Sequence, residues 1–248
     1  MFILSTLFFI TAILYSSVGF GGGSTYLALL LIWNVPFNIF PVLALICNII
    51  VVSGNCFNYI KAGNHNFKLL IPFLIGSIPM AFIGGTLEIS KEIFEISLFL
   101  VLSIAGLMLL TNNRSYQAIN FKIKKPNQFF NIFIGSFLGL ISGVVGIGGG
   151  IFLSPILFLL KIDKPKNIIT SASLFILINS FSGILGQLTK ETVIDHIVIY
   201  WPLFLSVLIG GLIGNYLNIK ILNGRVLAII TSLLVIFLSI RMGFKIFL

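Results

Sequence analysis

The stretch that decides the fold is VGFGGGSTYLALLLIW, from Val18 to Trp33, in which four glycines interrupt a run that is otherwise nearly all apolar. A near copy, VGIGGGIFLSPILFLLK, runs from Val145 to Lys161. A glycine inside a helix costs about 1 kcal/mol relative to alanine, so three in succession predict that the helix breaks. The chain therefore interrupts an apolar helix twice, in the same manner.

Composition indicates that these breaks lie in a membrane. Hydrophobic residues make up 58% of the 248 residues and charged residues 8%, whereas a soluble domain has roughly 45 to 50% and about 25%. Mean hydropathy is +1.16. The net charge of +9 comes from residues near helix ends or in loops, so it indicates membrane orientation and not nucleic-acid binding. The sequence predicts a multi-pass protein of the cell (inner) membrane, with the lipid bilayer as its surroundings.

Long apolar runs supply the membrane spans. Each approaches the roughly 20 residues that a helix needs to cross about 30 Å of hydrocarbon. Met1–Val18 lacks the basic n-region and the A-x-A cleavage site of a signal peptide, so we expect it to remain as a helix. The other expected spans include Ile39–Ile60, Phe67–Leu87, Ile93–Leu110, Ile168–Leu188, Ile197–Leu217 and Val226–Phe247.

The sequence contains an internal repeat. Gly19–Gly23 (GFGGG) aligns with Gly146–Gly150 (GIGGG) at an offset of 127, and later proline, lysine, glycine and Ser-Gly positions align at 129 or 130. Such self-similarity indicates two copies of one structural unit. We expect a first membrane repeat at 1–111, a basic cytoplasmic linker at 112–127 and a second membrane repeat at 128–248.

A short apolar helix follows each break. Ser24–Trp33 and Ile151–Leu160 have ten residues each, which extend only about 15 Å, half of the hydrocarbon thickness. Either each helix and its half-helix fold back as a re-entrant hairpin, or the two continue as one kinked span. The distribution of Lys and Arg separates these alternatives, because both gather on the cytoplasmic side.

The hairpin alternative gives the stronger charge bias. Of 15 Lys and Arg residues, it puts eleven on one face and four (Lys91, Lys190, Arg241 and Lys245) on the other, against nine and six for kinked spans. With hairpins the two repeats enter the membrane from opposite sides. The sequence therefore predicts an all-α polytopic membrane protein of two inverted repeats, each a glycine-broken helix and half-helix hairpin plus three transmembrane helices, with about 8 to 10 hydrophobic segments in total. The eleven are Lys61, Lys68, Arg114, Lys122, Lys124, Lys125, Lys161, Lys164, Lys166, Lys220 and Arg225.

The breaks are candidate binding sites for an anion. Broken helices are tolerated at membrane depth where they line a cavity or pack in protein, and the N-termini of half-helices point N–H groups at anionic substrates. The alternative is that the glycines only allow helices to pack closely. Packing is the favoured interpretation for Gly84, Gly106, Gly135 and Gly139, so that Gly84→Ala should be milder than valine at a break. Neither break matches the G-x-G-x-x-G or P-loop pattern.

Polar residues recur along the long helix after each half-helix. Asn48 and Asn55 lie on one stripe, and Asn179 and Ser182 on the other. Interhelical hydrogen bonds explain such residues as well as substrate contacts do, and both interpretations stay open. The candidate substrate-binding residues are Gly19, Gly21, Gly22, Gly23, Ser24 and Thr25 at the first break, Gly146, Gly148, Gly149 and Gly150 at the second, and Asn48, Ser53, Asn179 and Ser182.

Catalytic chemistry is not indicated. The acidic residues and both histidines lie near helix ends or in loops, so no intramembrane proton relay or set of nucleophile and base can be assembled. Cys47 and Cys56 fit no metal-binding spacing. The sequence predicts a protein that is not an enzyme and has no catalytic residue, no metal site and no cofactor.

The chain resembles the TauE/SafE family of sulfite exporter-like or toluenesulfonate-uptake permeases. The resemblance is carried by the doubled GxGGG break in a chain of this length and by the "SPIL" of Ser154–Leu157. The resemblance implies a carrier of sulfur-containing anions such as sulfite or organosulfonates. The family often has proline a few residues after both breaks. Ser154-Pro155 fits this pattern, whereas Leu27-Ala28 departs from it.

The leading hypothesis is therefore a secondary transporter, a permease or exporter, of a small anion that binds between the two breaks. An anion channel is one alternative, and a non-transporting membrane accessory subunit is another. The expected partners are the anionic substrate and the bilayer, with no nucleic acid, and a homo-oligomer stays open.

Overall fold

A computed structural model describes residues 1–111, 127–160, 162–190 and 197–220, with a few positions between 233 and 244. The described residues form helices and connecting turns without any β-strand. Two 3₁₀ helices, η1 (Phe37–Ile39) and η3 (Ile197–Tyr200), precede α3 and α9. The α-helices are α1 (Phe2–Val18), α2 (Gly23–Ile32), α3 (Phe40–Lys61), α4 (Phe67–Thr86), α5 (Lys91–Thr111), α6 (Gln128–Val145), α7 (Gly150–Leu160), α8 (Pro165–Gln187) and α9 (Trp201–Lys220).

The order of elements is the same in both halves. Each begins with a helix, a glycine break and a short helix, so that α1, α2, α3 and α4 correspond to α6, α7, α8 and α9. This confirms the predicted all-α fold and the two half-length helices. Most of the expected last helix, Val226–Phe247, and residues 112–126 of the linker lie outside the described residues. The division into two repeats and a linker stays a prediction.

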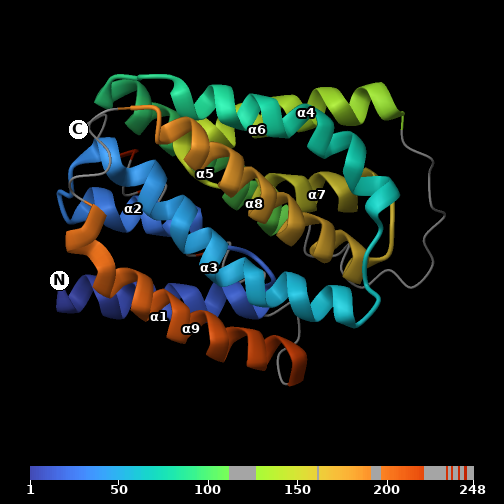
Figure 1. Cartoon of the computed structure of the whole chain (residues 1–248), viewed down its shortest axis with the longest axis horizontal. Coiled ribbons are helices and arrows are strands. Elements are labelled where there is room, and N and C mark those ends of the chain that lie inside the picture. The colour runs from blue at the N-terminus through green and yellow to red at the C-terminus, as the bar shows by residue number, and fades with distance from the viewer. Residues whose placement is uncertain are drawn as a thin grey trace.

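Helices of one half pack on helices of the other. The most extensive contacts join α4 to α6 and α1 to α9, and Figure 1 shows each pair side by side along its length. The backbone of Gly84 (α4) lies against the Leu140 carbonyl (α6), and that of Gly214 (α9) lies against the Ile13 carbonyl (α1). These two contacts are related by the repeat. Each half therefore packs its helix α4 or α9 on the first helix of the other half, α6 or α1.

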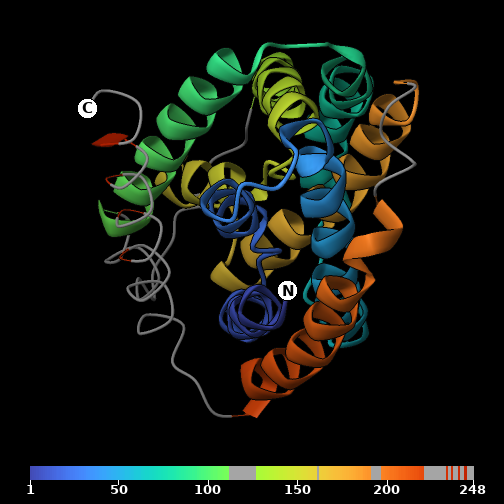
Figure 2. The same cartoon turned by 90° about the vertical axis from the view of Figure 1, so that its left-hand side faces the viewer.

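The central pair α3 and α8 runs antiparallel. Leu45, near the start of α3, lies at Gly183 near the end of α8, whereas Tyr59 and Ile169 meet beside Gly19. Figure 2 shows α2, α3 and α8 between the α4–α6 pair on one side and the α1–α9 pair on the other. Two equivalent helices in opposite directions are what inverted repeats require. Which way each half crosses a bilayer stays a prediction.

Glycine contacts between helices support the packing interpretation at the scattered positions. A Cβ atom at Gly84, Gly135 or Gly139 would overlap the backbone of the neighbouring helix, as in small-xxx-small interfaces. Gly84→Ala is therefore not the mild substitution that the sequence suggested, because its methyl group would meet the Leu140 carbonyl.

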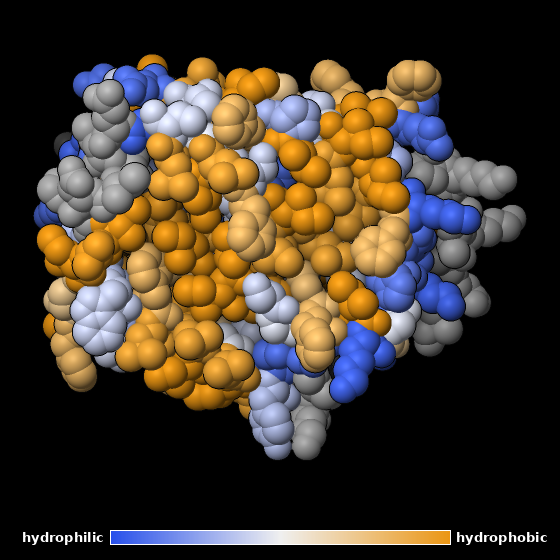
Figure 3. Space-filling view, viewed as in Figure 1, coloured by the Kyte–Doolittle hydropathy of each residue, from blue (hydrophilic) through white to orange (hydrophobic). Residues whose placement is uncertain are grey.

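The surface carries an apolar belt. Five described helices are long and apolar enough to cross a membrane, and α1 and α2 are shorter apolar helices. Figure 3 shows hydrophobic residues over the middle of this face and hydrophilic ones toward its two ends, one of which is the end where α3 meets α4. Lys61, Lys68, Lys164 and Lys166 belong to that end, which supports the predicted cytoplasmic side.

Cysteine substitutions at two exposed loop residues, one at each end of α4, test this orientation. In a chain whose two buried cysteines are replaced by alanine, Ser90→Cys in the α4–α5 loop should react with an impermeant thiol reagent on intact cells. His65→Cys in the α3–α4 loop should react only after the membrane is opened. Both positions are exposed, so access depends on the side alone. The reverse labelling pattern would contradict the orientation.

A buried carboxylate joins loops of the two halves at the predicted cytoplasmic end. Asp163 is 4% exposed and accepts hydrogen bonds from Asn66 Nδ2 at 2.6 Å and Asn167 Nδ2 at 3.0 Å. The Lys164 N–H donates to it at 2.6 Å. Asn66 also caps α4 by accepting from the Leu69 N–H at 3.2 Å. One side chain therefore ties the start of α4 to the start of α8.

Asp163→Asn should destabilise the protein without removing side-chain volume. An amide can accept on only one of its two terminal atoms, so at least one of the partly buried donors loses its partner, at a cost of up to about 1 to 3 kcal/mol. We expect a lower melting temperature in detergent. Lys164→Ala, which keeps the backbone N–H and changes an exposed side chain, is the control. Equal melting temperatures for Asp163→Asn and the parent would contradict the role of this carboxylate.

Candidate functional site

The first break begins where Gly19 leaves the helical conformation. Its φ of 88° is left-handed, a conformation that only glycine adopts without strain. The N–H groups of Gly19 and Phe20 then turn back to the carbonyls of Ser16 and Tyr15 and close the end of α1. Gly22, also at φ 88°, is the N-cap of α2, which starts at Gly23.

The second break repeats this geometry. Gly146 ends α6 with φ 88°, and its N–H donates to the Ser142 carbonyl at 2.8 Å. Gly148 and Gly149 follow with φ 84° and 74°, and α7 starts at Gly150. Left-handed glycines therefore stand at both ends of each break, at repeat-related positions.

Equivalent N–H groups are unpaired at the two half-helices. Within the described residues, no acceptor is found for the backbone N–H groups of 21–24 at the first break or of 148–151 at the second. These sets are equivalent at the offset of 127. The first four N–H groups of any helix lack partners within it, and here they are buried, because residues 15–31 and 145–155 are all buried. Each half-helix thus presents unused donors and a positive dipole end in the protein interior.

Asn48 of α3 brings the two breaks together. Its Nδ2 donates to the Ile147 carbonyl of the second break at 3.1 Å. A Cβ atom at Gly21 or Gly23 of the first break would overlap the same amide, and one at Gly148 would lie 3.0 Å from its Nδ2. Asn48 is 0% exposed, and its Oδ1 has no partner among the described residues. The Asn48 amide therefore lies at the glycines of both breaks. Contact with a substrate stays a prediction.

Hydroxyl groups surround the first half-helix. The Tyr15 hydroxyl lies 2.8 Å from Thr25 Oγ1 and 3.4 Å from Ser24 Oγ. Three hydroxyl protons serve these two bonds, so at least one O–H can donate elsewhere. The Tyr26 hydroxyl, also buried, has no partner in the described part of the chain. The first break therefore adds side-chain donors to its backbone donors.

The second half-helix lacks this hydroxyl cluster. Ile151 and Phe152 stand at the positions of Ser24 and Thr25. Ser180 of α8 lies at the second break instead, with its Oγ 3.3 Å from where a Cβ at Gly148 would be. That Oγ is buried without a partner among the described residues. The two breaks are therefore alike in backbone and different in side chains.

Side chains of α8 bind carbonyl groups that the breaks release. Ser173 Oγ donates to the Gly19 carbonyl at 2.5 Å, and Gln187 Nε2 donates to the Gly143 carbonyl at 2.9 Å. Freed carbonyls at membrane depth need such partners. Sequence reasoning missed Ser173, Gln187, Tyr15 and Ser180. Only for Tyr15 was there a local signal, a hydroxyl one turn before the first break.

Three further predicted residues bond to helix carbonyls. Ser53 is exposed and its Oγ donates to the Ile49 carbonyl of its own helix at 2.5 Å, so the structure does not bring it to the breaks. Ser182 Oγ donates to the Ile78 carbonyl of α4 at 2.6 Å, which matches the interhelical interpretation. Asn179 is buried on α8, and its Nδ2 donates to the Phe175 carbonyl at 2.8 Å.

The family follows from a comparison over nearly the whole chain. A family model described as "Sulfite exporter TauE/SafE" matches residues 4–242. The chain belongs to the TauE/SafE family. This confirms the resemblance that the two breaks carry and makes the chain a multi-pass membrane transporter. No solved structure matches the chain.

Curated relatives of this TauE/SafE chain bear transporter names. It is 24% identical to the "Probable membrane transporter protein y4hK" of Sinorhizobium fredii, over 96% of each chain. It is 23% identical to the "Probable membrane transporter protein YunE" of Bacillus subtilis, over 94% of each. A protein of Methanocaldococcus jannaschii, "Probable membrane transporter protein MJ0441", is 26% identical over 74% of this chain and 71% of its own.

Proposed function

We propose that the chain is a secondary transporter of a small anion, with sulfite or an organosulfonate as the substrate class, bound between the two glycine breaks. One observation carries the proposal. Two repeat-related sets of four unpaired N–H groups come together at Asn48, whose amide lies beside Gly21 and Gly23 of the first set and Gly148 of the second. The description of the family as sulfite exporters supports the substrate class.

The chemistry of the breaks suits an oxyanion. Backbone N–H groups at helix N-termini bind sulfate-like and carboxylate groups without a fixed cation, and their electrostatic pull is stronger away from water. A sulfonate or sulfite group offers three oxygens as acceptors, which the N–H groups and the hydroxyls of Tyr15, Ser24 and Thr25 can share. Because these donors are neutral, no fixed positive charge holds the anion, and it can leave the site again.

Burial of the breaks favours a carrier over an anion channel. Residues 15–31 and 145–155 are all buried, so an anion between the breaks is separated from both sides. Release therefore requires the packed helices to move, as in alternating access, where one repeat rocks against the other. The proposed location is the cell membrane, with Lys61 and Lys68 on the cytoplasmic side.

Thermal stabilisation of the purified protein tests the binding step. A ligand that binds only the folded state stabilises it by RT ln(1 + [L]/Kd), about 2.7 kcal/mol at 100 times Kd. We expect sulfite and methanesulfonate to raise the melting temperature in detergent more than chloride does at equal ionic strength. The increase should disappear in Asn48→Asp. Identical curves with all anions would count against this substrate class.

A further inference from the structure

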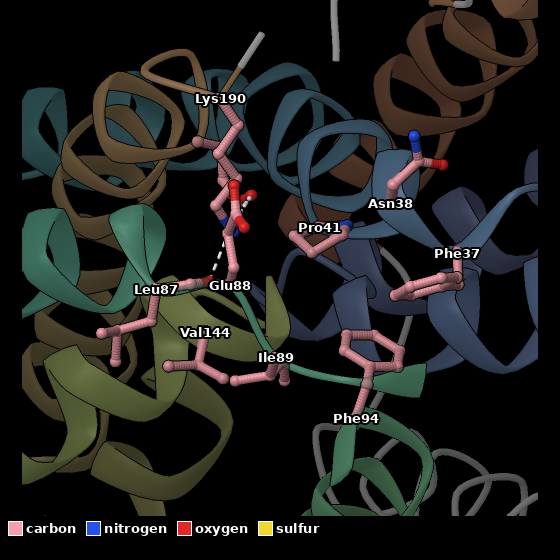
Figure 4. A pocket seen from close by; sticks show the side chains of 10 residues that line it. Phe37, Asn38, Pro41, Leu87, Glu88, Ile89, Phe94, Val144 and Lys190 are labelled. Atoms are coloured by element: carbon pink, nitrogen blue, oxygen red, sulfur yellow. Dashed lines mark hydrogen bonds between the residues drawn. The ribbon is translucent and has the colours of Figure 1, made fainter. Parts of the chain in front are cut away.

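A cavity of about 280 Å³ opens where α4 and α8 end and α3 begins, at the end opposite Lys61 and Lys68. Its wall includes Glu88 and Lys190, the charged side chains among its described lining residues. Figure 4 shows both side chains in this pocket, which comes from segments of both halves. A water molecule takes up about 30 Å³ in the liquid, so a small oxyanion fits with several waters.

The cavity reaches the second glycine break. Val144, in the last turn of α6, and Pro41 of α3 both line it. Pro41 packs directly on Gly146, because a Cβ atom there would lie 2.9 Å from the Pro41 carbonyl oxygen. Pro41 therefore lies between the cavity and Gly146, the glycine that ends α6.

Lys190 is fixed in this cavity by neutral acceptors. Its Nζ donates to the Leu87 carbonyl at 2.7 Å and to Gln187 Oε1 at 3.0 Å, and Figure 4 shows the first of these bonds. An ammonium group has three N–H donors, so these bonds leave one. Gln187 in turn donates to the Gly143 carbonyl at 2.9 Å, three residues before Gly146. The ammonium is thus positioned but not neutralised by these contacts.

Glu88 is the opposing charge on the same wall. Its side chain is exposed, whereas Lys190 is half-buried, and the two form no ion pair in the described part of the chain. Burial lowers the pKa of Lys190, and the nearby Glu88 raises it. Salt and water screen an exposed charge more than a half-buried one, so the charge of Glu88 is screened more than that of Lys190.

We infer that Lys190 and the cavity around it form a second anion site, an antechamber that holds the transported oxyanion on its way to or from the second break. This inference rests on the proposed function. It adds to the site a charged residue, Lys190, that makes binding of the oxyanion faster and tighter. A positive side chain at a cleft with low-dielectric walls raises the local concentration of an anion. The breaks then bind it by neutral donors.

Kinetics of sulfite uptake into proteoliposomes test the antechamber. At low ionic strength Lys190→Gln should raise KM roughly tenfold, by analogy with losing one charge-assisted contact, with little change in the maximal rate. Lys190→Arg should stay near the parent, and Glu88→Gln should lower KM. All of these differences should shrink at about 1 M salt, where the Debye length is about 3 Å.

A tether between α4 and α8 is the alternative role of Lys190. If Lys190 acts as such a tether, Lys190→Gln should lower the melting temperature and the maximal rate. Glu88→Gln should then have no effect on KM. That pattern, or an unchanged KM in Lys190→Gln, would overturn the antechamber while uptake by the parent chain upheld the proposed function. No uptake by the parent chain would overturn both.

Discussion

Valine at Gly22 or Gly149 is expected to abolish anion transport while the protein still inserts in the membrane. Both glycines have left-handed backbones, with φ of 88° and 74°, where a β-branched residue is strained by about 1 to 3 kcal/mol. A Cβ atom would also lie 3.1 Å from the Tyr26 ring at Gly22 and 2.8 Å from the Phe175 ring at Gly149. The new side chain would then cover the unpaired N–H groups of the half-helix.

Gly63→Val is the matched control for backbone strain. Gly63 has φ 72°, and a Cβ atom there would meet nothing within 4 Å. The control should lose some stability and keep its rate of uptake per inserted molecule. Uptake is measured in proteoliposomes and divided by the amount of protein that inserts. Normal transport by Gly22→Val and Gly149→Val would show that the glycines serve close packing alone.

Asn48→Asp should reduce transport to the level of empty liposomes. The substitution keeps the shape of the side chain but removes the N–H that Asn48 donates to the Ile147 carbonyl. Leaving that buried carbonyl unpaired costs about 1 to 3 kcal/mol. The new carboxylate would also put a negative charge beside Gly21 and Gly23, where the proposed substrate carries its own.

Ser53→Ala is the control on the same helix. Ser53 is exposed and bonds only its own helix among the described residues, so its uptake should equal that of the parent chain. The measurement is the initial rate of sulfite uptake for both variants in the same lipid. Substantial transport by Asn48→Asp would place the substrate elsewhere.

Local pattern was enough to predict the breaks and the half-helices. Left-handed turns need glycine, and both GxGGG motifs supply it at equivalent positions. The 3.6-residue period also explains why the structure brings Asn48, and not Ser53, to the glycine breaks. Five residues along a helix turn about 500°, so Ser53 lies about 140° around α3 from Asn48.

The contacts that complete the site could not be predicted in this way. Asn48 reaches a carbonyl 99 residues away, and Ser173 reaches one 154 residues away. Such hydrogen bonds depend on how the two halves pack. The local pattern of residues along the sequence does not carry that information. The two halves also differ at these places, because Ala44 stands where the repeat would put a partner for Ser173. Self-alignment therefore predicts the backbone of the site better than its side chains.

Counterflow of labelled sulfite in proteoliposomes tests most directly whether the two breaks carry an anion. Vesicles preloaded with unlabelled sulfite should take up external labelled sulfite with saturation and a transient overshoot, as a carrier with one alternating site requires. The overshoot should be absent from empty liposomes and from Asn48→Asp. Uptake by the parent chain no faster than by empty liposomes, or an equal overshoot in Asn48→Asp, would contradict transport between the breaks.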